Sequence, residues 1–258
     1  MRSSEWVSFG YFAALTAIAW MRSLPGRRRM TITAIGASTC AAILALARTG
    51  TPAARDWAPV VVIFVGYYLS GRFFCRPSEP FERWLMAWDR RLLGDPPTRF
   101  SHWPRSCLAY LEIMYMGTFL VVPAGFAALA LAGRGDLADR YWTIVITAEF
   151  GAFAPLSLIQ SRPPWALERP AALPDRAVHD FASLIVERFS IQANTFPSGH
   201  AAGSLAVALA VVGTLPWTGA VLLTVALSIS IACVVGRYHY VADVVAGAVL
   251  ALLIWLAN

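Results

Sequence analysis

Long apolar runs alternate with shorter polar connections along most of this chain. The runs fall at about residues 5–21, 30–48, 57–74, 106–132, 141–160, 200–214, 217–236 and 240–257. A helix needs roughly 20 apolar residues to cross the hydrocarbon core of a bilayer, so the runs predict eight transmembrane helices. The shortest runs must extend into their flanking residues to reach that length. We therefore expect an all-α fold, a polytopic transmembrane helical bundle.

The composition of the chain also indicates a membrane protein. Of its 258 residues, 58% are hydrophobic and 14% are charged, and the mean hydropathy is +0.58. Soluble domains carry about 25% charged residues, so most of this surface must face lipid. The expected partner of that surface is a lipid bilayer and not nucleic acid. All 21 basic residues are arginine, which a GC-rich genome explains, although the planar guanidinium also suits phosphate.

Two longer polar connections, 75–105 and 161–199, interrupt the pattern. The first has apolar residues at helical spacing: Phe81, Trp84, Leu85, Trp88 and Leu92. Charged residues between them complete the pattern of a helix that lies in the membrane interface. The second contains a shorter amphipathic stretch at 178–189. Both connections follow odd-numbered apolar runs, so we expect them on the same side of the membrane.

One histidine stands at the start of an apolar run. His200 ends the string Thr195-Phe196-Pro197-Ser198-Gly199-His200. Ser198 has the side chain of a helix N-cap, and Gly199 allows a ligand to approach the backbone closely. Free N–H groups and the positive end of the helix dipole make such a start an anion site. The string therefore predicts phosphate binding through Ser198 and Gly199.

A second histidine precedes an aspartate by four residues, in Gly236-Arg237-Tyr238-His239-Tyr240-Val241-Ala242-Asp243. On a helix this spacing places His239 and Asp243 on one face. The carboxylate can hold one imidazole nitrogen as N–H and leave the other as a nucleophile. Asp243 also stands at the head of an apolar run, where an acid is costly and more often functional than not.

Each of these residues also has a structural explanation. An isolated histidine at a membrane boundary is usually interfacial, and Asp243 alone could be an N-cap. Together, however, the two histidines, the aspartate and the phosphate cradle fall on one face of the membrane, because two spans separate 161–199 from 236–239. Glu112 and Glu149 lie within apolar runs, where hydrogen bonding between helices and a role in a polar cavity are equally good explanations.

These residues resemble the type 2 phosphatidic acid phosphatase superfamily, which has three motifs. The central motif, Pro-Ser-Gly-His, is matched in full by Pro197–His200. The first motif, Lys-x6-Arg-Pro, is matched by Arg162, Arg169 and Pro170, with arginine in place of the lysine.

The third motif, Ser-Arg-x5-His-x3-Asp, is matched only in part. His239 and Asp243 are present, but Ala232 and Cys233 replace the serine and the arginine, and Arg237 lies nearby in another register. This departure is similar to the branch of the superfamily that includes sphingolipid and phosphoinositol phosphotransferases.

The resemblance covers roughly residues 57–258. It implies a six-helix phosphatase-like core there, with interfacial segments at 75–105 and 161–199. The N-terminal transmembrane helices, in residues 1–56, fall outside it.

The resemblance also implies a mechanism. His239 would attack phosphorus and form a phosphohistidine, Asp243 would orient its ring, and His200 would act as general acid and base. Arg162, Arg169 and Arg237 would hold the phosphoryl oxygens, with the N–H groups of Ser198 and Gly199.

No metal or cofactor is expected. Arginines take the place of a metal ion in this mechanism. The four cysteines, Cys40, Cys75, Cys107 and Cys233, are scattered, and no pair has the spacing of a metal-binding motif.

The leading hypothesis is thus an integral membrane lipid phosphatase that hydrolyses a lipid phosphate or diphosphate. Its nearest alternative is a lipid phosphotransferase that passes the phospho-headgroup to an alcohol acceptor by the same histidine chemistry. A second alternative is a non-catalytic headgroup binder or transporter, which Glu112 and Glu149 favour. A binder, however, has no need for a histidine–aspartate pair facing another histidine.

We expect the chain in the inner membrane of a bacterium. The resemblance implies a site on the extracytoplasmic face, but the positive-inside rule favours the opposite. The connections on the side of the site hold Arg22, Arg27–Arg29, seven arginines in 72–105 and four in 161–199. The other side has only Arg2, Arg48, Arg55, Arg134 and Arg140.

Overall fold

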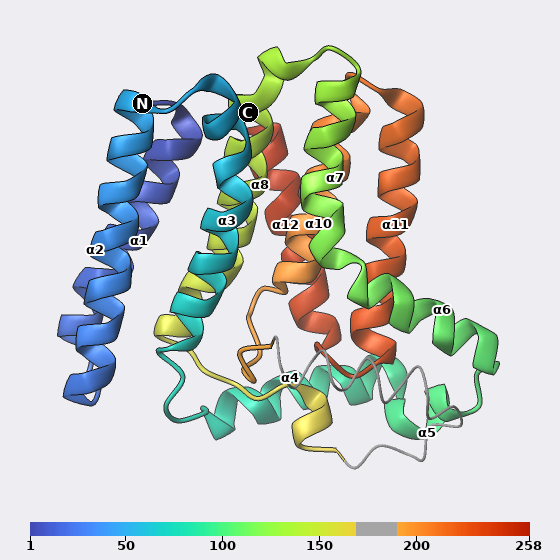
Figure 1. Cartoon of the computed structure of the whole chain (residues 1–258). Coiled ribbons are helices and arrows are strands. Elements are labelled where there is room, and N and C mark those ends of the chain that lie inside the picture. The colour runs from blue at the N-terminus through green and yellow to red at the C-terminus, as the bar shows by residue number, and fades with distance from the viewer. Residues whose placement is uncertain (169–189) are drawn as a thin grey trace.

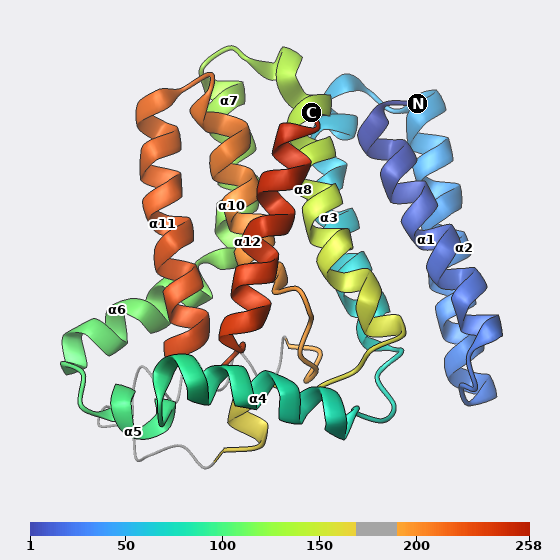
Figure 2. The same ribbon diagram turned by 180° about the vertical axis from the view of Figure 1, so that it is seen from behind.

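The computed structural model describes residues 1–168 and 190–258, and within these ranges the chain is an all-α bundle (Figures 1 and 2). The helices that lie side by side are α1 (Ser3–Met21), α2 (Gly26–Thr49), α3 (Pro52–Gly71), α7 (Thr118–Leu131), α8 (Ala138–Phe153), α10 (Gly199–Val212), α11 (Pro216–Val235) and α12 (Val241–Leu256). Between the two described parts of connection 161–199, Ser161 and Asn194 form an isolated β-bridge. The predicted fold class is therefore confirmed.

By length and composition, two described helices can cross a membrane, namely α2 and α11. The bent pair α6–α7 passes the same test as one unit. The helices α10 and α12 are apolar but have only 14 and 16 residues. The chain is thus a helical membrane protein, and eight crossings remain a prediction.

The run at 106–132 does not form the single helix that its hydropathy predicts. It divides into α6 (Arg105–Met116) and α7, which are bent by 61°. The Tyr110 hydroxyl lies 2.8 Å from Ser228 Oγ of α11, and the Tyr115 ring stacks on Tyr238. These contacts hold α6 obliquely beside the lower half of α11 (Figure 1). Hydropathy cannot reveal the bend, because both halves are apolar.

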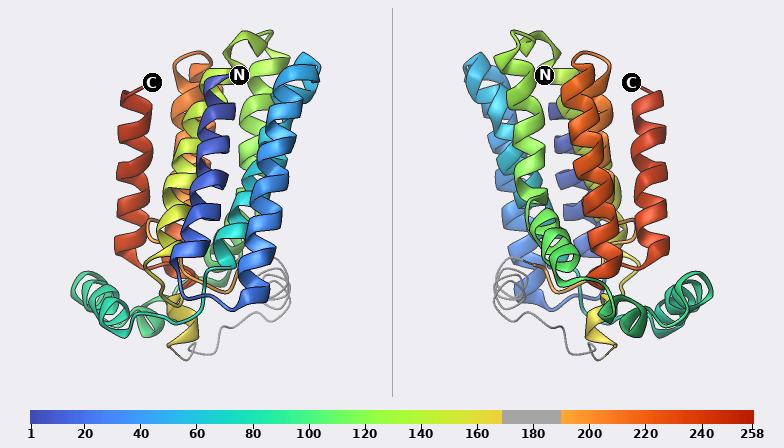
Figure 3. Two further views of the ribbon diagram at one scale, coloured as in Figure 1. Left: turned by 90° about the vertical axis from the view of Figure 1, so that its left-hand side faces the viewer. Right: turned by 90° about the vertical axis from the view of Figure 1, so that its right-hand side faces the viewer.

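The predicted helix in connection 75–105 is present. Helices α4 (Glu79–Leu93) and α5 (Pro96–Ser101) lie across one end of the bundle, and α4 extends beyond its side (Figure 3). Leu85 is buried, whereas Trp84, Trp88 and Leu92 are exposed. Exposed indole rings beside a bundle end fit a helix at headgroup depth. The amphipathic stretch predicted at 178–189 lies outside the described residues.

Helix α10 is the centre of the bundle and is buried along most of its length. Its small residues, among them Ala201, Ala202 and Ala206, allow α8, α11 and α12 to pack closely around it. On the outside, α1 joins the core where Tyr11 stacks on Phe150 of α8, with ring centroids 3.9 Å apart. Both termini lie at the end of the bundle opposite α4 (Figure 1).

Candidate active site

The start of α10 is fixed against the start of α12. Ser198 caps α10 by accepting a hydrogen bond from the Ala201 N–H, and its own N–H donates to the Asp243 carbonyl at 2.9 Å. Gly247 makes this approach possible, since a Cβ there would lie 2.6 Å from the Ser198 carbonyl oxygen. The predicted N-cap is therefore present, and it positions His200 one residue into the helix.

The turn between α11 and α12 places His239. Helix α11 ends at Val235, and Arg237 adopts a left-handed conformation with φ +59°. The N–H groups of Tyr238 and His239 both donate to the Cys233 carbonyl at 2.9 Å. The chain thus folds back on the end of α11, and His239 precedes α12 instead of lying within it. The contact between His239 and Asp243 therefore comes from the turn and not from helical periodicity.

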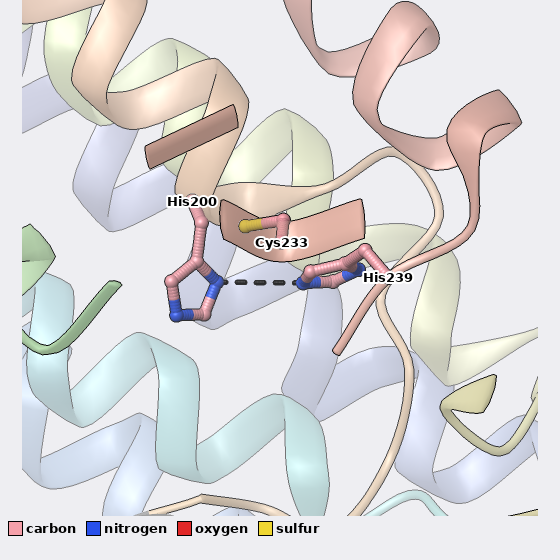
Figure 4. A group of neighbouring side chains, drawn as sticks. All are labelled: His200, Cys233 and His239. Atoms are coloured by element: carbon pink, nitrogen blue, oxygen red, sulfur yellow. Dashed lines mark hydrogen bonds between the residues drawn. The ribbon is translucent and has the colours of Figure 1, made fainter. Parts of the chain in front are cut away.

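The structure brings the three predicted catalytic side chains together. The His239 Nε2 lies 3.4 Å from the His200 Nδ1 (Figure 4). The His239 Nδ1 lies 3.4 Å from Asp243 Oδ2. The same Asp243 oxygen accepts a 2.9 Å hydrogen bond from the Tyr240 N–H. Both His239 and Asp243 are buried. Within the described residues the His239 Nδ1 makes no hydrogen bond, so its contact with Asp243 is a close approach alone.

Burial also sets the charge of the His239 ring. Removal from water disfavours the imidazolium and lowers the pKa of His239 to about 3. The ring is therefore neutral at pH 7. A neutral imidazole with one unprotonated nitrogen is the form that can act as a nucleophile.

Aromatic rings surround the histidine pair. The Tyr115 ring stacks on Tyr238 at 3.8 Å and on His200 at 4.8 Å between centroids. A small cavity beside them is also lined by Trp165 and His239. Sequence reasoning missed these rings. Tyr238 adjoins His239 and could have been suspected, but nothing in an apolar run distinguishes Tyr115.

The first predicted phosphate ligand, Arg162, is bound to an acid of α4. Its Nε and Nη2 donate to the two oxygens of Glu82 at 3.0 and 2.8 Å, and its backbone N–H donates at 2.7 Å. Burial of Glu82 opposes ionisation, but these hydrogen bonds hold the pKa of Glu82 below its ordinary value. The Arg162 side chain remains 40% exposed. Tyr240 also donates to the Arg162 carbonyl, so this segment adjoins the turn that carries His239.

Two acids hold the guanidinium of Arg237. Its Nη1 donates to Asp89 at 2.8 Å, and its Nε donates to Glu168 at 2.8 Å. The side chain is only 10% exposed. The turn is non-helical, and within it Arg237 points to these carboxylates. Arg169 lies outside the described residues.

The N–H groups of Ser198 and Gly199, which the sequence predicts to bind phosphate, both donate hydrogen bonds within the protein. The Ser198 N–H donates to Asp243, and the Gly199 N–H donates to Thr195 Oγ1 at 3.3 Å. A Cβ at position 199 would lie 2.5 Å from the Phe153 ring. Gly199 therefore permits close helix packing, a role that sequence reasoning did not assign to it.

A narrow apolar cleft with a cavity volume of about 50 Å³ reaches His200. Helices α3, α7, α8 and α10 line it, with Phe64, Phe119 and Val122 among its residues. The buried carboxyl group of Glu149 also faces this cleft. Glu149 thus borders an apolar cleft and not the polar cavity that was one of its two explanations, and its role stays a prediction.

A further grouping was not visible in the sequence. Cys233 of α11 lies beside His200 and His239, and one potential ligand atom from each falls within 4.8 Å of the others. The spacing of cysteines along the chain indicates no metal-binding group, but three separate elements bring these three side chains together (Figure 4).

Comparison with known proteins agrees with this geometry. The family model described as PAP2 superfamily matches residues 83–257, which include all three catalytic candidates. No curated protein and no solved structure gives a significant match to the chain.

Proposed function

The chain belongs to the PAP2 superfamily, and this membership supports a phosphatase-type function. From this premise we propose that the protein is a membrane lipid phosphatase. It removes phosphate from a lipid phosphate or diphosphate through a phosphohistidine intermediate. The observation that carries the proposal is the line from Asp243 through His239 to His200, with 3.4 Å at each contact.

In this mechanism Asp243 holds the Nδ1 proton of His239, and Nε2 attacks phosphorus. The P–O bond to the lipid breaks as the N–P bond forms. His200 gives its proton to the departing oxygen, then removes a proton from the water that attacks the phosphohistidine. For this first step His200 is protonated when substrate is bound, because the arriving phosphate dianion favours the imidazolium.

Arg162 is the proposed phosphate ligand. Glu82 holds two of its nitrogens, and Nη1 makes no hydrogen bond within the described residues. An ion pair of this kind orients the guanidinium before substrate binds, so that Nη1 can stabilise charge that builds on phosphorus. Arg169, from the same motif, is proposed as the second ligand.

The apolar cleft supports a lipid substrate. It extends from His200 between α3 and α7, and its walls are mainly aromatic and aliphatic. An acyl chain that entered between α3 and α7 by widening this cleft would place its phosphate beside the histidine pair. The headgroup would then enter from the side of α4.

Trapping of the intermediate tests the mechanism. Wild-type protein in detergent should release phosphate from phosphatidic acid, and His239→Ala should not. His200→Ala should accumulate acid-labile phosphohistidine from a substrate with a good leaving group. Normal release by folded His239→Ala would exclude His239 as nucleophile. A folded, inactive enzyme without phosphohistidine in any variant would contradict the covalent route.

A phosphotransferase is the second candidate. It is favoured by the enclosure of His239, which is 5% exposed. Such enclosure would limit attack by water and favour a bound alcohol. Free phosphate from phosphatidic acid without an acceptor supports the hydrolase. Headgroup transfer that requires added diacylglycerol or ceramide supports the transferase.

Arginine ligands predict that turnover needs no divalent metal. Activity should survive exhaustive EDTA treatment, and vanadate should inhibit by mimicking the trigonal-bipyramidal state. Strict dependence on Mg²⁺ would contradict the role of Arg162.

We propose the inner membrane as the location, with the site on the extracytoplasmic face. The C-terminus and the site lie at opposite ends of the bundle (Figure 1). A C-terminal fusion should therefore be active with green fluorescent protein and inactive with periplasmic alkaline phosphatase. The reverse result would support the orientation that the arginine distribution favours.

A further inference from the structure

Cys233 stands where the third motif of the superfamily has an arginine, and this substitution changes what the histidine pair can bind. An arginine at this position adds positive charge to the site and repels cations. A cysteine adds a soft sulfur ligand. The Cys233 side chain is fully buried, and its neighbours include the two imidazole rings (Figure 4).

The geometry of the three side chains suits a tetrahedral metal ion. Two nitrogens bound to one zinc at ~2.0–2.1 Å lie about 3.4 Å apart at a tetrahedral angle. The His239 Nε2 and the His200 Nδ1 are already 3.4 Å apart. A thiolate at ~2.3 Å from the same ion would lie about 3.6 Å from each nitrogen. Since the ligand atoms all lie within 4.8 Å of one another, a shift of at most about 1.2 Å completes the set.

We propose that His200, Cys233 and His239 form a binding site for a thiophilic divalent ion, Zn²⁺ above all, and that occupation of this site inhibits the enzyme. Binding replaces the thiol proton of Cys233, which passes to solvent, by a zinc–sulfur bond. The fourth coordination position is left for water, and the cavity lined by His200, Tyr238 and His239 can supply it. Two imidazoles and one thiolate form a ligand set typical of zinc.

Inhibition follows from the identity of the ligand atoms. The metal occupies Nε2 of His239, the nitrogen proposed to attack phosphorus, and the His200 nitrogen that faces it. The same two histidine nitrogens thus carry out metal-free catalysis and, when they bind zinc, cause inhibition. The inhibitory effect rests on the proposed function, whereas metal binding does not.

Cobalt tests the binding without reference to activity. Detergent-purified wild-type protein titrated with Co²⁺ should give thiolate-to-cobalt charge-transfer absorption, and Zn²⁺ should abolish it. Cys233→Ser should lose this absorption and bind zinc at least ~10-fold more weakly, since even residues around a metal's ligands cost that much when replaced. A triple variant with Cys40, Cys75 and Cys107 changed to serine is the matched control, and it should retain the absorption.

Three results would overturn the site. One is cobalt–thiolate absorption that persists in Cys233→Ser, and another is its loss in the triple variant. The third is zinc-loaded wild-type protein whose X-ray absorption spectrum contains only nitrogen and oxygen ligands, a measurement that needs no variant to fold. If Cys233→Ser stays as sensitive to zinc as wild type, inhibition arises elsewhere. If cobalt binds as expected but no lipid phosphate is turned over, the site stands and the proposed function fails.

Discussion

Asp89 of α4 forms an ion pair with Arg237, 148 residues later in the chain, at 2.8 Å. The other oxygen of Asp89 accepts a 2.9 Å hydrogen bond from the N–H of Val241, the first residue of α12. The two side chains of the pair are only 1% and 10% exposed. An amphipathic helix at the end of the bundle therefore holds both sides of His239 in place.

Removal of the Asp89 charge should destabilise the protein. In Asp89→Asn the buried guanidinium keeps, among the described residues, only Glu168 as an ionic partner. Loss of one member of a buried pair costs about 3 kcal/mol. Thermal unfolding in detergent measures the effect. Glu79→Gln on the same helix is the control, because its pair with Arg83 is 65–77% exposed and should contribute less than ~1 kcal/mol. Equal stability of both variants would show that the Asp89 pair does not anchor α4.

Arg237 should act on the position of the turn and not on phosphate directly. Arg237→Lys can reach only one of the two acids, so both Arg237→Lys and Arg237→Ala should unfold at lower temperature. With a short-chain soluble substrate, kcat of the folded protein should fall less than ~10²-fold, the loss expected when one transition-state donor is deleted. A larger loss of kcat in Arg237→Ala, with an unchanged unfolding temperature, would instead indicate that Arg237 binds phosphate directly.

Asp243→Asn should remove orientation of the nucleophile while it keeps the fold. The amide oxygen can still accept from the Tyr240 N–H, as Asp243 Oδ2 does at 2.9 Å. It cannot fix the Nδ1 proton of His239 as a carboxylate does, so kcat should fall by about 10²–10⁴-fold. Phosphate release and thermal unfolding, measured on the same preparation, separate the two effects. Near-normal kcat would mean that Asp243 only stabilises the start of α12 and does not orient His239.

Acid should destabilise the protein partly through His239. Its pKa is about 3 in the folded state and about 6.5 when exposed, so below pH 6.5 the unfolded chain binds the proton more readily. This contribution to stability is complete above about pH 6.5 and is lost as pH falls toward 3. The unfolding temperature should therefore fall more steeply between pH 7 and pH 5 in wild type than in His239→Gln. Parallel curves would indicate that the folded protein accepts the proton freely.

Many features of this protein follow from short stretches of its sequence. The apolar runs predicted the helices, and Trp84 and Trp88 marked the amphipathic helix α4. Ser198 predicted the cap of α10, because a cap depends only on residues a few positions away. His200, His239 and Asp243 could be recognised because their chemistry is unusual at the ends of apolar runs. Fold class and catalytic candidates were thus available from the sequence alone.

The surroundings of the catalytic residues were decided only by tertiary structure. Glu82 and Asp89 look like the solvated face of an interfacial helix, yet they pair with Arg162 and Arg237 from distant segments. Cys233 looks like a small core residue until the turn at Arg237 brings His239 beside it. Hydrophobic periodicity determines which face of a helix is buried but does not specify which partner it meets. Contacts between elements far apart in sequence depend on the packing of the whole bundle, and these contacts set the charge and the ligands of the site.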